Sequence, residues 1–201
     1  MSGCLYPKKG GRMSEVKGRV LKSIQKFIIK KFGKEGFDRW LDAISVEAYT
    51  IYAQPIDTNE WYPLKTALID PMANVAQLFY KWDLKEAAWE FGRYAADFGL
   101  KGPYKALVKI TSAKTMIYKS GDLLATYYRP CKAEVITFED GRSVVRIKEF
   151  TDMDKTTEYR IAGWVQRGLE INGCKEVKVE ITRSLTTFDP YTEYTITWET
   201  K

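Results

Sequence analysis

The chain has 201 residues, of which 45% are hydrophobic and 14% aromatic, and its formal net charge is +6. That much apolar and aromatic surface excludes a largely disordered chain. The sequence contains no histidine, which excludes Ser-His-Asp and Cys-His catalytic systems and histidine-ligated metal sites. No run approaches the roughly 18 to 20 apolar residues that cross a bilayer, and no secretory signal is recognisable, so we expect a cytoplasmic protein.

The excess positive charge is concentrated near the N-terminus. Ten lysines and arginines fall within residues 8–34, against the single acidic residue Glu15. Solvated lysines on the outer face of a helix are the simplest interpretation, and nucleic-acid binding is disfavoured because the other face of this segment is apolar. Peripheral membrane contact through the basic N-terminus is left open as an alternative.

The first part of the sequence changes from an irregular tail to helical periodicity. Residues 1–13 have no periodicity and are expected to form a flexible basic tail. Apolar residues then recur at helical spacing between Ser14, the expected N-cap, and Gly33, the expected end of the first helix. A short second helix is expected around Trp40, and residues 46–55 are expected to be an extended connector.

Further helices follow before the period changes. Residues 58–81 are expected to be helical with a break at Pro71. Asp83 is the expected N-cap of the next helix. After an interruption at Gly102-Pro103 and a short helical segment, a longer helix is expected over about residues 112–128.

The last part of the sequence has the period of two that is typical of strands. Asp140-Gly141 lies between two β-rich runs and predicts a hairpin, and a helix from Asp154 to Gly173 separates it from two more strands. The expected strands are residues 132–138, 143–150, 177–182 and 193–198. The sequence therefore predicts one α+β domain over residues 14–201. A helical lobe (about 14–128) is followed by a four-stranded antiparallel sheet in strand-strand-helix-strand-strand order (about 129–201).

The remaining residue types form no catalytic or metal-binding constellation. Glycine-rich phosphate-binding motifs are absent. Glu139 and Asp140 fall in a predicted turn, and Asp152 and Asp154 fall at a helix start, where turn and cap roles explain them. The three cysteines are far apart in the sequence and are expected to be reduced thiols. We therefore expect no enzymatic activity, no cofactor and no metal site.

A ligand site is expected where the helical lobe meets the sheet. Met116, Ser120, Leu123 and Tyr127 on the long predicted helix are spaced by four, three and four residues, so they share one face. Pockets favour places where two packed layers meet, and Tyr127 would offer a ring and a hydroxyl to a ligand. Plain core packing predicts the same spacing, so both readings stay open.

Three segments resemble a known superfamily. They are KGRVLKSIQKFIIKKFG, TEYRIAGWVQRGLEINGCKEVKVEITRS and FDPYTEYTITW. Each is similar to uncharacterised bacterial members of the superfamily that contains the heme-nitric-oxide/oxygen-binding domains and the vinyl-reductase-type small-molecule-binding domains. In the closing segment Asp189 and Pro190 match a recurring Gly-Asp-Pro-x-Cys ending, whereas Phe188 and Thr192 replace its Gly and Cys. The resemblance implies a helical N-terminal lobe, a long helix and a four-stranded antiparallel sheet interrupted by a helix.

The same resemblance implies a heme-less member. The heme-binding relatives carry a proximal histidine on the long helix, and this chain has none. Of their Tyr-x-Ser-x-Arg motif only Tyr118 and Ser120 are present, with Asp122 where the arginine is required.

The leading hypothesis is therefore a non-catalytic small-molecule-binding or sensory module. It would hold a hydrophobic small molecule where the lobes meet and would signal in trans, since no output domain is recognisable in the sequence. The alternative is a protein-protein interaction scaffold or adaptor with no small ligand, whose partner is another protein or a second copy in a homodimer.

Overall fold

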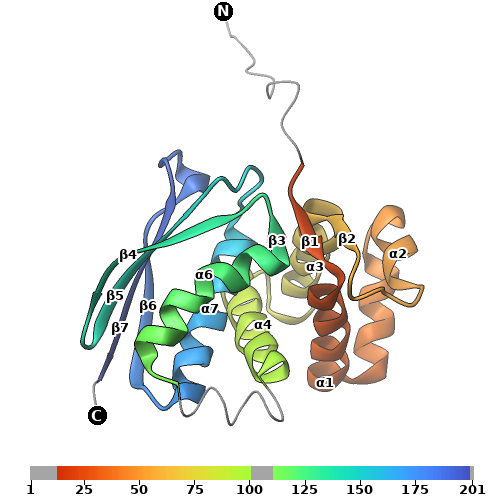
Figure 1. Cartoon of the computed structure of the whole chain (residues 1–201). Helices are drawn as coiled ribbons and strands as arrows, with labels where there is room; N and C mark the ends of the chain where they lie inside the picture. Colours follow the sequence, from red (N-terminus) through yellow and green to blue (C-terminus); the bar gives the residue numbers. More distant parts are fainter. Residues whose placement is uncertain (1–12, 101–110, 200–201) are drawn as a thin grey trace, which may run out of the picture.

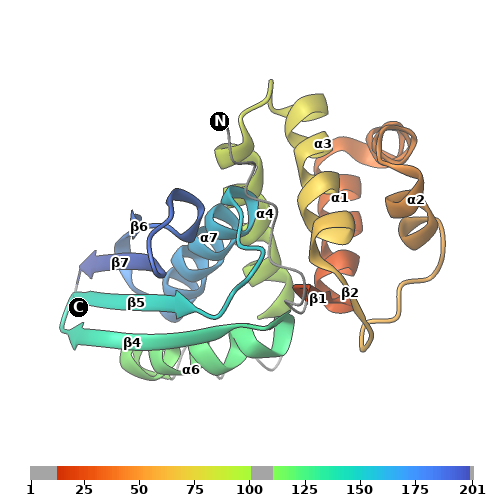
Figure 2. The same ribbon diagram turned by 90° about the horizontal axis from the view of Figure 1, so that it is seen from above.

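The computed structural model describes residues 13–100 and 111–199. Helices dominate the first part of the chain, and a four-stranded sheet with two helices forms the second part (Figures 1 and 2). This is the α+β organisation that the sequence predicts, with the expected strand-strand-helix-strand-strand order. The helical segment expected after Gly102-Pro103 and the tail of residues 1–12 lie outside the described residues.

The helical lobe is built around α1, which bends in its middle. Gly33 adopts a φ of +74° inside α1, so this residue kinks the helix rather than ending it as expected. The short second helix expected around Trp40 is the part of α1 beyond the kink, where the buried Trp40 indole donates to the Pro71 carbonyl at 2.9 Å. The elements of this lobe are α1 (Gly18–Ala43), α2 (Val46–Tyr52), the π-helical turn η1 (Lys65–Ile69), α3 (Asp70–Phe79) and α4 (Leu84–Gly99).

The prediction of an extended connector over residues 46–55 is wrong, because residues 46–52 form the helix α2. Its N-cap is Ser45, whose hydroxyl oxygen accepts from the Ala48 amide at 3.2 Å. The aromatic and β-branched residues of this segment favour a strand locally. Burial of Tyr52, whose hydroxyl donates to the Ala67 carbonyl at 2.6 Å, stabilises the helix instead.

The helix predicted over residues 58–81 begins later than expected. Residues 61–63 form a short strand, and the helix starts with the π-helical turn, in which the Asp70 amide donates to the Lys65 carbonyl. Pro71 lies in the first turn of α3, where its missing N–H does not interrupt the helix. The predicted break at Pro71 is therefore a change from π to α geometry.

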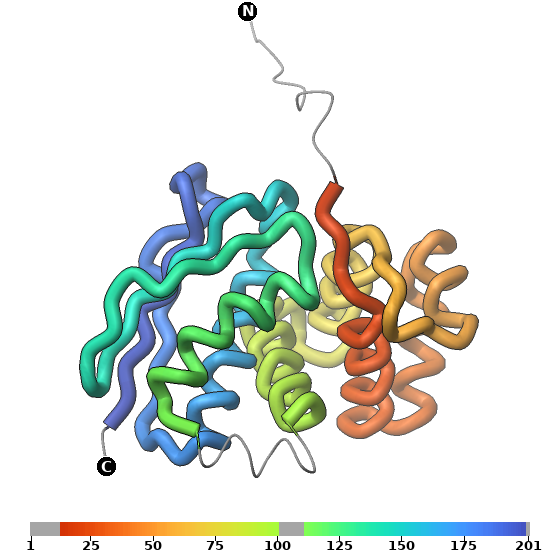
Figure 3. Tube along the Cα trace, viewed as in Figure 1, coloured from red at the N-terminus to blue at the C-terminus, as the bar shows by residue number. Residues whose placement is uncertain are grey.

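A small sheet that the sequence does not predict joins the two lobes; its strands are labelled in Figure 1, and Figure 3 traces the chain in the same view. Strand β1 (Glu15–Lys17) lies between β2 (Trp61–Pro63) and β3 (Tyr128–Arg129) and is antiparallel to both. Ser14 precedes β1 instead of capping α1, and it exchanges two hydrogen bonds with Asp152. Since β1 leads directly into α1 and β3 directly follows α6, this sheet fixes the start of α1 near the end of α6.

The four-stranded sheet is antiparallel throughout, in the order β4-β5-β7-β6. Helices α6 and α7 pack on one side of it, and α4 of the helical lobe packs against α7 (Figure 2). The hairpin at Asp140-Gly141, the N-cap at Asp154 and the helix end at Gly173 confirm the predictions for this half. Its elements are α6 (Ala113–Tyr127), β4 (Lys132–Glu139), β5 (Arg142–Lys148), α7 (Lys155–Asn172), β6 (Lys175–Arg183), the 3-10 turn η2 (Leu185–Thr187) and β7 (Thr192–Glu199). Helix α6 lies within the range expected for the helical lobe (about 14–128), but it packs on β4 and is therefore grouped with the sheet lobe.

Two glycines bring α4 and α7 into close contact. A Cβ on Gly92 would lie 2.1 Å from the carbonyl oxygen of Arg160, and a Cβ on Gly163 would lie 2.2 Å from the carbonyl oxygen of Trp89. Only glycine at these positions lets the two backbones approach this closely. The contact sets the first half of α7, including Arg160, against α4.

Candidate functional site

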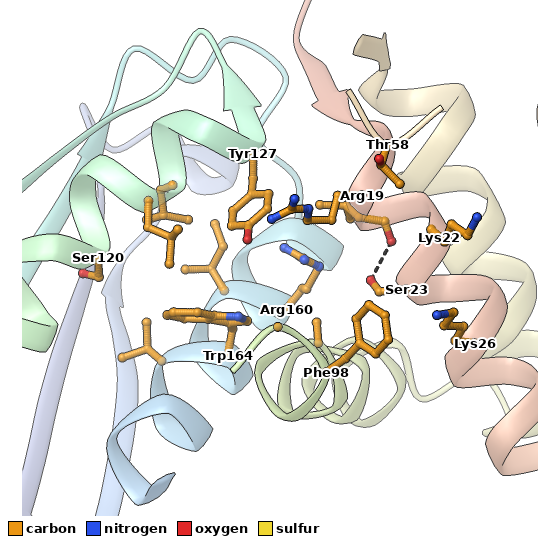
Figure 4. A pocket seen from close by; sticks show the side chains of 17 residues that line it. Arg19, Lys22, Ser23, Lys26, Thr58, Phe98, Ser120, Tyr127, Arg160 and Trp164 are labelled. Atoms are coloured by element: carbon orange, nitrogen blue, oxygen red, sulfur yellow. Dashed lines mark hydrogen bonds between the residues drawn. The ribbon is translucent and has the colours of Figure 1, made fainter. Parts of the chain in front are cut away.

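Four helices surround a cavity of about 350 Å³ between the two lobes. The first half of α1, the end of α4, the second half of α6 and the first half of α7 each contribute to its wall (Figure 4). We call it the junction cavity. Its apolar wall consists of Val20, Ala95, Phe98, Leu123, Leu124, Ile161, Trp164 and Val165. This volume lies at the lower end of the range of small-molecule sites, about 300 to 1,000 Å³.

The structure brings three of the four predicted site residues to this cavity. Ser120, Leu123 and Tyr127 line it, and Figure 4 shows the hydroxyl of Tyr127 directed into it. Met116 lies outside it, where its Cε is 3.8 Å from the position that a Cβ on Gly168 would occupy. The helical face predicted for α6 thus extends past the cavity, and its first residue packs against α7.

The one buried charged side chain among the described residues of the cavity wall is Arg160, which is not among the site residues predicted from the sequence. Its residue is 5% exposed, and in Figure 4 its guanidinium is directed among Tyr127, Trp164 and Phe98. A signal exists in the sequence, because Arg160 precedes Trp164 by four residues and therefore shares its face of the helix. An arginine on an otherwise apolar helix face is unusual enough to mark the position.

Arg160 is incompletely paired. One guanidinium nitrogen, Nη1, donates to the Tyr128 hydroxyl. Its Nε is buried and has no hydrogen-bond partner, and among the described residues no carboxylate lies within 4.0 Å of the guanidinium. The guanidinium carbon lies 5.1 Å from the centroid of the Phe91 ring and 5.5 Å from that of Tyr128, so aromatic faces supply its main favourable contacts.

Tyr128, which accepts the hydrogen bond from Arg160, stays protonated at physiological pH. Burial raises the pKa of Tyr128 to about 12, although the neighbouring charge of Arg160 acts in the opposite direction. The hydroxyl is therefore a neutral acceptor for Arg160 and does not neutralise its charge.

The mouth of the cavity is also positive. Arg19, Lys22 and Lys26 on the first turns of α1 are exposed and line it, and Lys26 Nζ lies 4.4 Å from the centroid of the Phe98 ring. Within the described ranges, no aspartate or glutamate lines the cavity. The electrostatic potential at the site thus favours anions and disfavours cations.

The two serine hydroxyls of the cavity wall donate to backbone carbonyls. Ser23 donates to the Val20 carbonyl at 2.6 Å, and Ser120 donates to the Ile117 carbonyl at 2.6 Å. Cys131 is not part of the wall, and burial raises its thiol pKa to about 12. In the part of the chain that the structure describes, no group of three or more Asp, Glu or Cys residues could hold a metal ion. The arrangement can bind and orient a molecule.

None of the described helices combines the length and apolarity needed to cross a bilayer.

Comparison with known proteins finds solved structures that share the fold of this chain. No protein-family model and no curated protein matches its sequence. An H-NOX protein from S. oneidensis, in the Fe(II) ligation state, matches with a TM-score of 0.72 at 9% sequence identity, covering 92% of this chain and 97% of that one. The Fe(II) unliganded H-NOX protein from K. algicida matches with a TM-score of 0.68 at 10% identity, covering 92% and 97%. The F78L variant of Tt H-NOX matches with a TM-score of 0.65 at 14% identity, covering 92% and 95%.

At these identities the likeness concerns the fold, and it confirms the resemblance found in the sequence at that level. The matches extend over both lobes, since each covers 92% of the chain. The chain therefore has the fold of the H-NOX domains.

Proposed function

We propose that this chain is a cytoplasmic, non-catalytic module that binds a small molecule in the junction cavity and passes the binding event to another protein in trans. The observation that carries the proposal is the cavity itself. It lies between two lobes, is mainly apolar, and contains one buried, incompletely paired arginine. Such a combination of apolar wall and few convergent polar groups is typical of ligand sites.

The position of the cavity suits a sensory role. A ligand there would touch α1 from the helical lobe and α6 and α7 from the sheet lobe at the same time. Binding energy that depends on the spacing of the lobes shifts the population toward the spacing that fits the ligand. A partner that contacts both lobes would detect that shift.

A histidine-ligated heme does not fit this site. The H-NOX structures that match include Fe(II) unliganded and Fe(II)NO states, but this chain contains no histidine. Of the side-chain types that ligate heme iron, which are His, Cys, Met and Tyr, only Tyr127 is found among the described residues of the cavity wall. The proposed function therefore involves no heme.

The experiment that tests the proposal fills the cavity. Leu123→Trp places an indole in the wall, and Ala125→Trp on the exposed face of the same helix is its matched control. Native mass spectrometry of the purified proteins measures whether a small molecule is retained. We expect wild type and Ala125→Trp to retain one, and we expect Leu123→Trp to stay folded without it.

Two results would overturn the proposal. One is unfolding of Leu123→Trp while Ala125→Trp stays folded, because the junction would then be solid core. The other is an apo mass for wild type together with equal binding of added apolar molecules by wild type and Leu123→Trp. In either case the scaffold or adaptor hypothesis becomes the better account.

A further inference from the structure

We infer that the ligand of the junction cavity is an amphipathic carboxylate, with its carboxylate bound by Arg160 and its apolar chain lying along Leu123, Trp164 and Phe98. This inference rests on the proposed binding function and adds the chemical class of the ligand.

Arg160 is a buried cation that has no counter-ion among the described residues. An arginine cannot lose its proton to relieve burial. A charged group that is 5% exposed and has one neutral hydrogen-bond partner is unfavourable unless an anion joins it. Since the described residues supply no such anion within 4.0 Å, an external one would complete the site.

The guanidinium of Arg160 uses only one of its three nitrogens in a hydrogen bond to a described residue. Tyr128 occupies Nη1, whereas Nε is unpartnered. No hydrogen bond joins Nη2 to any described residue either. Because Nε is covered by protein atoms, a ligand in the cavity would reach the guanidinium through Nη2, whose N–H groups can donate to a carboxylate oxygen.

The single buried positive charge of Arg160 limits the negative charge that a buried head group can carry. One buried cation balances the single negative charge of a carboxylate. A phosphate monoester carries nearly two charges and three strong acceptor oxygens at neutral pH, which exceeds what Arg160 alone provides. The exposed cations Arg19, Lys22 and Lys26 at the mouth would raise the rate at which anions enter.

The apolar part of the cavity wall determines the rest of the ligand. Beyond Arg160 the wall is aliphatic and aromatic, so it favours a chain without further polar groups. The volume of about 350 Å³ limits that chain to a modest length. Decanoate has these properties and is the probe that we choose.

The test compares ten-carbon compounds that differ in their head group. Isothermal titration calorimetry at neutral pH measures decanoate, decanol, decylamine and decyl phosphate against the full chain. We expect decanoate to bind about ten- to a hundredfold more tightly than decanol, which is the usual worth of hydrogen bonds to a charged group. We expect decyl phosphate to bind less tightly than decanoate and decylamine not to bind.

Arg160→Met identifies the residue responsible. Methionine keeps the length and apolar stem of arginine without the charge, so the preference for decanoate over decanol should disappear. Arg167→Met is the matched control on the same helix, because Arg167 is paired with Asp97 and Glu170 and is not part of the cavity wall. It should leave the preference unchanged.

The outcomes separate this inference from the function on which it rests. Failure of all four compounds to bind the wild-type chain overturns the proposed function as well. Equal affinity for decanol and decanoate, or a preference for decyl phosphate, overturns the carboxylate inference alone. A decanoate preference that survives in Arg160→Met overturns the role of Arg160. If Arg160→Met does not fold, the wild-type comparison together with Arg160→Lys decides. Lysine keeps the charge but loses the Nη2 donor of the guanidinium, and it should weaken decanoate binding about tenfold.

Discussion

Glu158 and Arg160 lie two residues apart on α7, are both buried, and have opposite electrostatic surroundings. Two residues correspond to about 200° around a helix, so the side chains point to opposite faces. Glu158 Oε1 accepts from Ser184 Oγ at 2.7 Å and from Thr192 Oγ1 at 2.6 Å, and Lys155 Nζ lies 3.0 Å from Oε2. Arg160, on the cavity side, has only one hydrogen-bond partner among the described residues, the Tyr128 hydroxyl. On one face of α7 the buried charge thus has several polar partners, and on the other face the buried charge has one hydrogen bond to a neutral hydroxyl.

The Glu158 network predicts a large loss of stability on truncation. In Glu158→Ala the Ser184 and Thr192 hydroxyls lose their shared acceptor inside the protein. We expect the free energy of unfolding to fall by roughly 3 kcal/mol, measured by urea denaturation. Glu180→Ala on the exposed side of β6 is the control and should change it by less than about 0.5 kcal/mol. Similar values for the two variants would show that the network is not important for stability.

The close contact of α4 and α7 makes a second stability prediction. In Gly163→Ala the new methyl group would meet the Trp89 carbonyl oxygen, so the helices must separate. We expect a loss of roughly 1 to 3 kcal/mol. Gly99→Ala, at the end of the partner helix α4 and with no atom within 4 Å of the new Cβ, should be neutral or slightly stabilising. Equal thermal stability of the two variants would contradict the helix contact.

The heme prediction can be checked by spectroscopy. The chain has no histidine, and Cys131 lies outside the cavity wall. We expect the protein purified from heme-supplied cells to have no Soret band at stoichiometric intensity, and added hemin to give no saturable one-to-one complex. A saturable Soret change that is lost in Tyr127→Phe would instead indicate a tyrosine-ligated heme.

The ion pairs between α4 and α7 predict a specific acid sensitivity. Burial opposes ionisation of Glu170, but hydrogen bonds from Arg93 and Arg167 outweigh it and hold the pKa of Glu170 below its usual range. A glutamate in the unfolded chain takes up its proton near pH 4.3, whereas folded Glu170 does so at lower pH. The unfolded state therefore binds more protons in this window, and stability falls as the pH drops from about 4.3 through the folded pKa.

Replacement of Glu170 should remove this contribution. Glu170→Gln should be less stable than wild type at pH 7, and its stability should fall less steeply below about pH 4.3. Denaturant melts across that range measure both effects. Parallel acid curves for the variant and the wild type would contradict the assignment.

An element can be predicted from the sequence when the contacts that stabilise it join residues close together in the chain. Asp83, Ser112 and Asp154 each cap a helix through a hydrogen bond to a nearby amide, so α4, α6 and α7 are visible in the sequence. Strand β1 has three residues and pairs with β2 and β3, which lie far away in the sequence. Nothing local signals such a strand, so the sequence pattern predicts the start of a helix there instead.

The candidate site was predictable to a similar extent. The spacing of Ser120, Leu123 and Tyr127 along one helix places them on a common face, and the structure brings all three to the cavity wall. Arg160 and Phe98 reach the same cavity from α7 and α4, and only the tertiary arrangement brings them there. Sequence periodicity describes one helix at a time, so it cannot combine faces from four helices.

The most direct test of the central claim is fluorine NMR of the chain labelled with 5-fluorotryptophan, during titration with decanoate. Trp164 lines the junction cavity, whereas Trp82 is 68% exposed and is not part of its wall. The Trp164 resonance, assigned from Trp164→Phe, should shift saturably, with the affinity that calorimetry gives, and the Trp82 resonance should stay in place. A Trp164 resonance that does not respond at saturating decanoate would contradict ligand binding between the lobes.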